Sequence, residues 1–300
     1  LMSNDAYVDA TSQILERTYR AEHDPVGLAR SYERRLALSP IDYKADWAAL
    51  AEVTENLARD PVSAFGVWSR AIAATPEDTS ILEHLVRLAM QETLWRDLAG
   101  RLDHLLGESL PPDIEQTYAM KLGEVSEDKL ADLDAAARAY ERAANAGEPH
   151  VALTALERVL ARSNRWPDLA GVLKRQADTT QDDAQIGEYL YRLGDLQETT
   201  LSDHAAAVAS YREVLGISPS HHNARTALQR MLAKAPDQRA QIVEVLEPLF
   251  ERDGEHAQLL EVLEARLDIT DDPLDRASLL ARILELAEQR LGNYSRALEA

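Results

Sequence analysis

The chain has 300 residues, of which 45% are hydrophobic, so it can bury a sizeable core and general disorder is excluded. Aromatic residues make up only 5% and the apolar residues are mostly alanine and leucine, which favours helices and excludes an all-β fold. The 52 acidic and 32 basic residues give a formal charge of -20, which argues against binding to nucleic acid or anionic lipid. The sequence has no cysteine and no apolar run of membrane-spanning length, so disulfides, cysteine-ligated metals and transmembrane helices are excluded.

Helix starts are marked along the chain by aspartate followed by proline. Asp24-Pro25, Asp60-Pro61 and Asp272-Pro273 each place an N-cap carboxylate before a proline at the first helical position, where the missing N–H costs nothing. Between such marks the apolar residues recur at helical spacing, for example over 82–89 and 153–160. The sequence therefore predicts a succession of helices joined by short turns.

Prolines also mark helix ends, and their spacing indicates a repeat. Pro40, Pro76 and Pro219 cannot continue a preceding helix and therefore end it. Pro40, Pro76 and Pro112 are spaced by 36 residues twice running. A unit of this length accommodates two helices, so each unit is expected to be a helix-turn-helix hairpin.

A longer repeat confirms this period in the sequence. Residues 95–102 recur as 166–173, and residues 118–143 recur as 189–214, both with a shift of 71. Seventy-one residues correspond to two units, so neighbouring units differ and alternate units are similar. In each unit a small residue such as Ala207 should allow the two helices to approach, and Tyr211 one turn later should fill the seam between units.

The units resemble the tetratricopeptide repeat (TPR) family, whose signature is W-x2-L-G-x2-Y, then A-x3-F, then P over about 34 residues. One unit, with an extra residue in the turn at Asp60-Pro61, matches this signature at Trp47, Leu50-Ala51, Ala64, Trp68 and Pro76. The resemblance covers essentially the whole chain. It implies an all-α, right-handed α-solenoid of about eight TPR-like helix-turn-helix units, in which stacked neighbours supply the stability that one unit lacks.

The last repeat is displaced from the regular period. Residues 280–297 correspond to 190–207 with a shift of 90 instead of 71, so nineteen residues are extra, enough for one additional helix. We expect this helix between about 236 and 272. Regular repeats then occupy 1–235, and 273–300 form the start of a further, truncated repeat.

No nucleotide-binding or catalytic motif occurs in the sequence. His221-His222 could suggest a metal site, and Asp182-Asp183 or Asp271-Asp272 could suggest calcium, but all three pairs stand at predicted helix starts, where capping explains them. Trp95 and Trp166 occupy the same place in two units and are expected to fill seams between repeats. We therefore expect no catalysis, no metal site and no cofactor.

The predicted functional surface is the concave face that the first helices of such solenoids line, where residues outside the core are free to contact a partner. Helical projection from the Leu-Gly anchors places seven acidic residues and one tyrosine on this face: Glu124, Glu127, Asp128, Tyr191, Asp195, Glu198, Glu285 and Glu288. The same projection places three arginines between them: Arg158, Arg162 and Arg225. We expect this face to bind a basic or amphipathic protein or peptide segment, and ordinary solvated surface is the alternative.

The resemblance implies a protein-protein interaction scaffold or adaptor. One alternative is the recognition arm of a larger enzyme or regulatory protein whose effector domain lies outside this chain. Another is an RNA-binding helical-repeat protein, which needs a basic face and therefore conflicts with the charge of -20. Because the sequence shows neither a signal peptide nor a transmembrane segment, a cytoplasmic location is expected.

Overall fold

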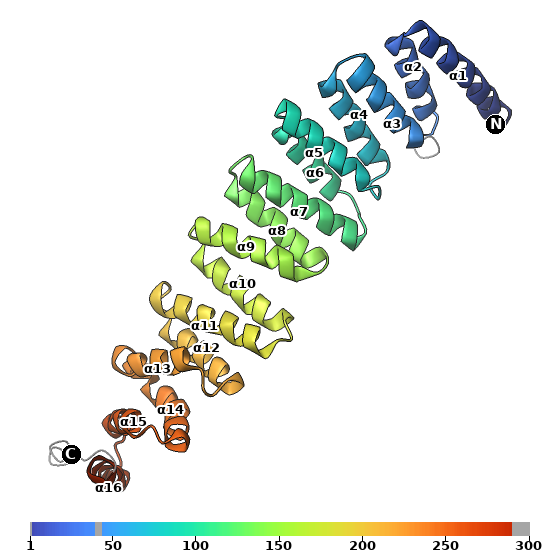
Figure 1. Cartoon of the computed structure of the whole chain (residues 1–300). Coiled ribbons are helices and arrows are strands. Elements are labelled where there is room, and N and C mark those ends of the chain that lie inside the picture. Colours follow the sequence, from blue (N-terminus) through green and yellow to red (C-terminus); the bar gives the residue numbers. More distant parts are fainter. Residues whose placement is uncertain (1, 40–43, 290–300) are drawn as a thin grey trace. The chain divides into compact units, whose positions relative to one another are not determined.

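The computed structural model describes the backbone of residues 2–39 and 44–289, and the side chains of 11–39 and 44–288 apart from residue 13. The chain divides into two compact units, Leu1–Val159 and Leu160–Ala300, and each is described by itself. In both units the helices lie side by side in chain order (Figure 1), and consecutive helices pack against each other from α1 to α8 and from α10 to α16. Pro40 lies outside the described residues, so the helix end predicted there is not observed.

The described residues form sixteen α-helices, one π-helical turn and one 3-10 helix, and they contain no β-strand. The elements up to α9 are α1 (Met2–Glu22), α2 (Pro25–Leu36), α3 (Lys44–Glu52), the π-helical turn η1 (Val53–Leu57), α4 (Pro61–Ala74), α5 (Ser80–Glu92), α6 (Trp95–Leu106), α7 (Pro112–Asp128), α8 (Leu133–Ala146) and α9 (Pro149–Arg162). The remaining elements are α10 (Trp166–Thr179), α11 (Asp183–Thr199), α12 (His204–Ile217), α13 (His222–Lys234), the 3-10 helix η2 (Pro236–Gln238), α14 (Arg239–Asp253), α15 (His256–Asp268) and α16 (Pro273–Gln289).

The predicted helix starts are confirmed, and their capping atoms are visible. Asp24 accepts hydrogen bonds from the backbone N–H of Val26 and Gly27, and Asp60 accepts one from Ser63. The extra residue expected in the turn at Asp60 is accommodated before that turn. It lies in the π-helical turn η1, which follows α3 and holds one residue more per turn than an α-helix.

The helices form hairpins, each closed by one residue in the left-handed backbone region. They are His23 after α1, Arg59 after η1, Thr93 after α5, Ala131 after α7, Asn164 after α9, Ser202 after α11 and Gly254 after α14. A left-handed residue at a helix C-terminus turns the chain back, so the next helix runs antiparallel to the one before. We call the helix before such a residue a first helix and the one after it a second helix.

The core follows the predicted repeat. The small residue Ala207 and the aromatic residue Tyr211 of α12 are both fully buried, as are their equivalents Ala136 and Tyr140 of α8. The tightest hairpins are α7–α8 and α11–α12, which are related by the 71-residue period. The predicted all-α solenoid of two-helix repeats is therefore confirmed.

The additional helix is also present. Three helices, α13, α14 and α15, lie between α12 and α16, whereas two, α9 and α10, lie between α8 and α11. The 90-residue shift already holds for α14, since Gly254 follows the equivalent left-handed residue Asn164 by 90 positions. Residues 222–234 of α13 also match 150–162 of α9, at a shift of 72, and Arg230 pairs with Glu198 as Arg158 pairs with Glu127. Helices α13 and α14 therefore both correspond to α9, and the additional helix is one of these two, of which α14 lies in the expected segment 236–272.

A buried arginine holds α13 in place. Arg225 donates to Asp253 at 2.5 Å and to Glu255 at 2.8 Å, which flank the turn between α14 and α15. It also donates to the Pro219 carbonyl oxygen at 2.6 Å, ahead of α13. The projection that placed Arg225 on a partner-binding face is thus corrected, because its side chain is only 7% exposed and all three of its nitrogen atoms donate within the fold.

Candidate functional site

The most distinctive repeated arrangement in unit 1 is a buried glutamate that joins two helices. The side chain of Glu127 on α7 is only 2% exposed, and its two oxygens accept hydrogen bonds from Arg158 of α9 at 2.9 and 2.6 Å. Tyr140 of α8 donates its hydroxyl to the same carboxylate at 3.1 Å. The charged guanidinium of Arg158 and the neutral hydroxyl of Tyr140 therefore compensate for the burial of this carboxylate.

A glycine in α7 positions the tyrosine. Gly123 lies one turn before Glu127, and a Cβ atom built on Gly123 would stand 2.4 Å from Cε1 of Tyr140. The tyrosine ring therefore lies directly on the backbone of α7, and its hydroxyl reaches the carboxylate. This contact explains why the Leu-Gly anchor precedes the glutamate in the sequence.

Unit 2 repeats the arrangement on α11. The side chain of Glu198 is also 2% exposed, and it accepts hydrogen bonds from Arg230 of α13 at 3.0 and 2.7 Å. Tyr211 donates its hydroxyl to this carboxylate at 3.2 Å, and Lys234 lies 3.6 Å from it. Gly194 provides the close approach, since its Cβ atom would stand 2.7 Å from Cε1 of Tyr211.

Two more pairs have the same form but a more exposed carboxylate. Glu55 of η1 accepts hydrogen bonds from Arg87 of α5 at 2.6 and 2.7 Å. Glu247 of α14 accepts one from Arg282 of α16 at 2.6 Å and one from Arg266 of α15 at 2.8 Å. We use the name glutamate–arginine pairs for these four contacts alone: Glu55–Arg87, Glu127–Arg158, Glu198–Arg230 and Glu247–Arg282.

The pairs shift the pKa values of the groups that form them. Burial alone would raise the pKa of Glu198, but the hydrogen bond and charge of Arg230, with Tyr211 and Lys234, bring it below its ordinary value. The hydrogen bond from Arg87 lowers the pKa of Glu55. Burial, and then the negative charge of Glu198, raise the pKa of the Tyr211 hydroxyl. Glu198 and Glu55 are therefore held ionised and Tyr211 is held neutral.

These contacts correct the expected role of two predicted binding residues. Glu127 and Glu198 do not lie on a free acidic face, because both are buried and their charges are balanced by arginine. Arg158 keeps 56% of its side chain exposed above Glu127, so an arginine meets solvent where a glutamate was expected. Glu124 and Asp128 on the same stripe of α7 are exposed, as predicted. Glu124 accepts a hydrogen bond from Lys121.

The remaining predicted residues differ in their surroundings. Asp195 is exposed on α11, and Tyr191 one turn earlier is half-buried, with its ring 5.3 Å from that of His221 and 5.8 Å from that of Tyr211. Burial, and then the charge of Asp195, raise the pKa of Tyr191. Arg162 of α9 is exposed. Glu285 and Glu288 are both exposed on α16.

Sequence reasoning missed the arginines that neutralise the glutamates on the neighbouring helices. Arg87, Arg230 and Arg282 were not predicted, although each follows its glutamate by about one repeat, at 32, 32 and 35 residues. A search for opposite charges at that spacing would have found them. Projection on single helices could not, because it gives the direction of a side chain but not the neighbour that it meets.

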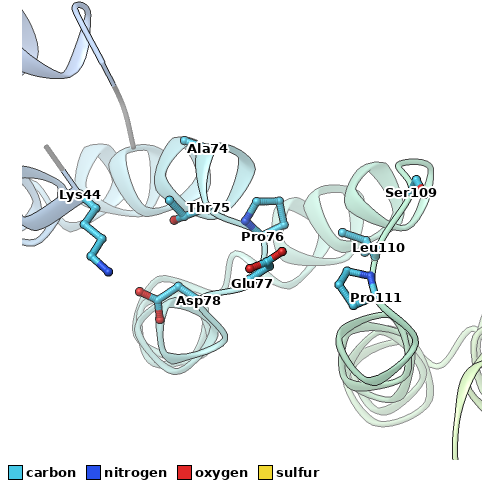
Figure 2. Close-up of a pocket in the computed structure, with 9 residues that line it drawn as sticks. All are labelled: Lys44, Ala74, Thr75, Pro76, Glu77, Asp78, Ser109, Leu110 and Pro111. Atoms are coloured by element: carbon cyan, nitrogen blue, oxygen red, sulfur yellow. The ribbon is translucent and has the colours of Figure 1, made fainter. Parts of the chain in front are cut away.

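A second candidate site is an open cavity of about 650 Å³ in unit 1. It lies where the turns before α5 and α7 meet the start of α3, and Figure 2 shows the side chains of Lys44 and Asp78 facing each other at one side, with Leu110 and Pro111 at the other and Pro76 between. Tyr118 donates its hydroxyl to the Pro76 carbonyl oxygen, and burial raises the pKa of Tyr118 to about 12. Asp78 accepts hydrogen bonds from the backbone and hydroxyl of Ser80, so it caps α5.

The other candidate residues have structural roles. The Nδ1 atom of His221 accepts the backbone N–H of Ala224 at 3.2 Å and caps α13, and Asp182 caps α11 in the same way. Trp95 is half-buried, with the Lys129 ammonium 5.4 Å from its ring centre.

No group of metal-binding side chains was found among the described residues. Within the same residues, every helix is too short or too polar to cross a membrane.

Comparison with known proteins links one part of the chain to a family. Residues 152–186 match the sequence model of the tetratricopeptide repeat. This segment begins in α9, contains all of α10 and ends within the first turn of α11, so it covers about one repeat. No curated protein sequence matches the chain at a significant level.

Several solved structures are similar to this chain at low identity. YrrB, a TPR protein with an unusual peptide-binding site, is 15% identical, with 66% of this chain and 98% of YrrB covered and a TM-score of 0.34. A tetratricopeptide repeat protein from Parabacteroides merdae ATCC 43184 is 12% identical over 94% of this chain and 99% of its own, with a TM-score of 0.32. Human IFIT1, in a dimer with PPP-AAAA, is 14% identical over 88% and 69%, with a TM-score of 0.37. All three TM-scores are below 0.5, so no property of those proteins is transferred to this chain.

Proposed function

We propose that this chain, a TPR-like helical-repeat protein, is an interaction scaffold that binds a segment of a partner protein on the surface of its first helices and catalyses no reaction. One observation carries the proposal. On the stripe of α7 and of α11 that bears a buried glutamate, the neighbouring positions hold polar and aromatic side chains that the core does not need. These are Glu124 and Asp128 in α7 and Tyr191 and Asp195 in α11. The first two belong to unit 1 and the last two to unit 2, and we call each pair the first-helix surface of its unit.

The chemistry of this surface favours a basic or amphipathic partner. Asp128 and Asp195 are exposed carboxylates in a protein with a net charge of -20, so a cationic segment is attracted over a long range. Tyr191 is a half-buried aromatic side chain one turn before Asp195, which suits a segment with an apolar side chain next to a lysine or arginine. The exposed part of Arg158 repels a uniformly basic segment in unit 1, so charge of both signs along the partner fits better.

The proposal is tested by capturing partners with the intact chain and identifying them by mass spectrometry. Each partner is then tested against a variant with Glu124→Lys, Asp128→Lys and Asp195→Lys. These residues are exposed, so the substitutions should leave the fold unchanged and abolish capture at low salt. Equal capture by the variant would place the binding site elsewhere.

A filter-binding titration with single-stranded RNA at low salt tests the competing class of ligand. The acidic surface predicts no tight binding, because a nucleic acid backbone gains affinity from lysine and arginine. Tight, salt-sensitive binding of RNA by the intact chain would contradict the proposal and identify RNA, not a protein segment, as the ligand.

A further inference from the structure

A cavity of about 430 Å³ lies among α6, α7 and α8 in unit 1. Helices α6 and α8 are both second helices, and both pack against α7. Leu106, Leu122 and Leu130 give the cavity an apolar lining, while Asp103 of α6 and Arg138 of α8 bring opposite charges to it. A largely apolar cavity of this size with a few charged groups has the character of a small-molecule site.

The equivalent place in unit 2 is crossed by side chains. Helices α10, α11 and α12 correspond to α6, α7 and α8 with the 71-residue shift. There, Lys174 of α10 forms an ion pair with Glu213 of α12 at 2.9 Å. Ser210 of α12 donates its hydroxyl to Gln197 of α11 at 2.7 Å. The three helices of unit 2 are thus connected by polar side chains at this place.

The residues of unit 1 do not reproduce the ion pair. Asp103 stands where unit 2 has Lys174, and a single methylene group replaces the flexible four-carbon stem of lysine, so the charged group has a shorter reach. Arg142 stands where unit 2 has Glu213, but it donates to Glu115 of α7 at 2.6 Å. The arginine that could meet Asp103 is therefore held by another carboxylate.

The hydrogen bond on α7 is lost as well. Ser126 and Ala139 stand where unit 2 has Gln197 and Ser210, and alanine has no hydroxyl to donate. The backbone of α6 leaves further space, because a Cβ atom on Gly100 would meet nothing within 4 Å. The cavity therefore results from the residues that the repeat carries here, with all three surrounding helices in place.

Two charges on the cavity wall have no partner within the fold. Among the described residues, neither Asp103 nor Arg138 takes part in an ion pair, whereas Arg142 is paired with Glu115 and Asp132 caps α8. An anion on one wall and a cation on the other complement a ligand that carries both charges. In unit 2 the protein supplies both charges of the bridge, and in unit 1 a ligand can supply them.

We propose that this cavity binds a zwitterionic α-amino acid with an apolar side chain. Its ammonium group pairs with Asp103, its carboxylate pairs with Arg138, and its side chain lies against Leu122. The bound ligand connects α6 to α8, as the ion pair connects α10 to α12. The cavity shares no residue with the first-helix surface of either unit, so this proposal and the proposed function can fail independently.

The lining favours this ligand over simpler ones. An anion alone would bring a like charge near Asp103, and a cation alone would do the same near Arg138. An inorganic ion would also leave the apolar lining in contact with water. A residue inside a polypeptide has neither charge on its backbone, so a free amino acid fits both walls better than a partner segment does.

Calorimetric titration of the full chain tests the proposal at about pH 6.5, where α-amino groups are protonated. We expect saturable binding of L-leucine and weaker binding of L-leucinamide, which lacks the carboxylate, and of 4-methylpentanoate, which lacks the ammonium group. Asp103→Asn should weaken leucine and leucinamide binding at least about fivefold, and Arg138→Gln should do so for leucine and 4-methylpentanoate. Each variant should bind the remaining analogue no more weakly than the parent does. Glycine should bind at least about tenfold more weakly than leucine, because it has no apolar side chain to bury.

Two glycine variants separate loss of the ligand from loss of the fold. Gly100→Leu places a side chain in the cavity and should abolish leucine binding. Gly171→Leu makes the same change at the equivalent position of α10 in unit 2 and should leave leucine binding unchanged. Nothing lies within 4 Å of the Cβ position of either glycine, and leucine favours a helix more than glycine does. Both variants should therefore resist urea at least as well as the parent.

Several outcomes overturn the proposal. They are no saturable binding of leucine, equal affinities for leucine and the two analogues, or equal effects of Gly100→Leu and Gly171→Leu on leucine binding. Displacement of leucine by inorganic phosphate at constant ionic strength, with equal binding of 4-methylpentanoate, would assign the cavity to anions. Failure of leucine to bind, together with loss of a captured protein partner in Gly100→Leu alone, would assign it to a partner protein.

Discussion

Each buried glutamate depends on a glycine one turn before it. Gly123 and Gly194 let the rings of Tyr140 and Tyr211 lie on the helix backbone, and those tyrosines donate to Glu127 and Glu198. A methyl group at either glycine would displace a ring that is fully buried. At these positions glycine is needed for close packing, although it is an unfavourable residue inside a helix.

Gly194→Ala should therefore destabilise the chain. The added Cβ atom would stand 2.7 Å from Cε1 of Tyr211, and overpacking of this kind costs about 1 to 3 kcal/mol, which exceeds the helix propensity gained of about 1 kcal/mol. Gly187→Ala in the same helix is the matched control, because nothing lies within 4 Å of its Cβ position. Urea midpoints should fall for Gly194→Ala and rise for Gly187→Ala. A rise in both would show that the ring does not lie on the backbone.

The buried tyrosines should make the fold sensitive to alkali. The pKa of Tyr118 is raised to about 12 by burial, and the pKa of Tyr211 is raised by burial and by Glu198. A raised pKa stabilises the fold fully below the unfolded value of about 10, and this contribution is lost as pH rises toward the folded pKa, by up to about 1.4 kcal/mol per pH unit for each tyrosine. Tyr211→Phe should flatten the fall in urea midpoint between pH 9 and 11. If the urea midpoint of Tyr211→Phe falls as steeply with pH as that of the parent, Tyr211 is not a source of the alkali sensitivity.

At the residue scale, caps could be read from the sequence and buried charges could not. Asp24, Asp60 and Asp272 were predictable because an N-cap bonds to a backbone group two or three residues away. The burial of Glu127 and Glu198 depends on an arginine about 32 residues later and a tyrosine thirteen residues later. Only the stacking of the helices brings those groups together.

At the scale of the element, the glutamate–arginine pairs fix how each helix meets the next one stacked on it. Removing one arginine leaves a buried carboxylate with less compensation. Arg230→Met should lower the free energy of unfolding by about 1 to 3 kcal/mol, less than for a fully buried pair because Arg230 is 44% exposed and Lys234 lies 3.6 Å from the carboxylate. Arg212→Met on the exposed side of α12 is the control and should change little. Equal midpoints in both variants would show that the pair does not stabilise the fold.

The same pair predicts a dependence on acid. The pKa of Glu198 is lowered from 4.5, so its contribution is present above that pH and is lost as pH falls through the folded pKa. The difference in urea midpoint between the parent and Arg230→Met should therefore be large at pH 7 and shrink below pH 4. A difference that is constant with pH would mean that Arg230 stabilises by packing alone.

The number of helices could be predicted from the sequence better than the place of the extra one. The 90-residue shift was read from residues 280–297, which lie in and beyond α16, so it showed that a helix was added but not where. The left-handed turn at Gly254 shows that α14 and α15 form a regular hairpin. The surrounding fold sets the left-handed φ angle at residues such as His23, Arg59 and Ala131. Their residue types do not predict this conformation from the sequence.

At the scale of the whole molecule, the repeat made the architecture predictable. Each hairpin is specified by contacts within about two units, so periodic spacing of Leu-Gly anchors and aspartate caps is enough to identify the solenoid. The surface was less predictable, because a side chain that projects outward from its own helix can be covered by the next. Reversal of Glu127 or Glu198 therefore tests stability, and only the exposed residues test binding.

The most direct test of the proposed function is the association rate of a captured partner at low and at high salt. Glu124→Lys, Asp128→Lys and Asp195→Lys together should slow association about tenfold or more at low salt and much less at high salt, because salt screens exposed charges. The control variant carries Asp103→Lys, Asp178→Lys and Glu213→Lys on second helices, which changes the net charge equally, and should be slowed far less. If the two triple variants are slowed to the same extent, net charge alone governs association and the first-helix surface is not the binding site.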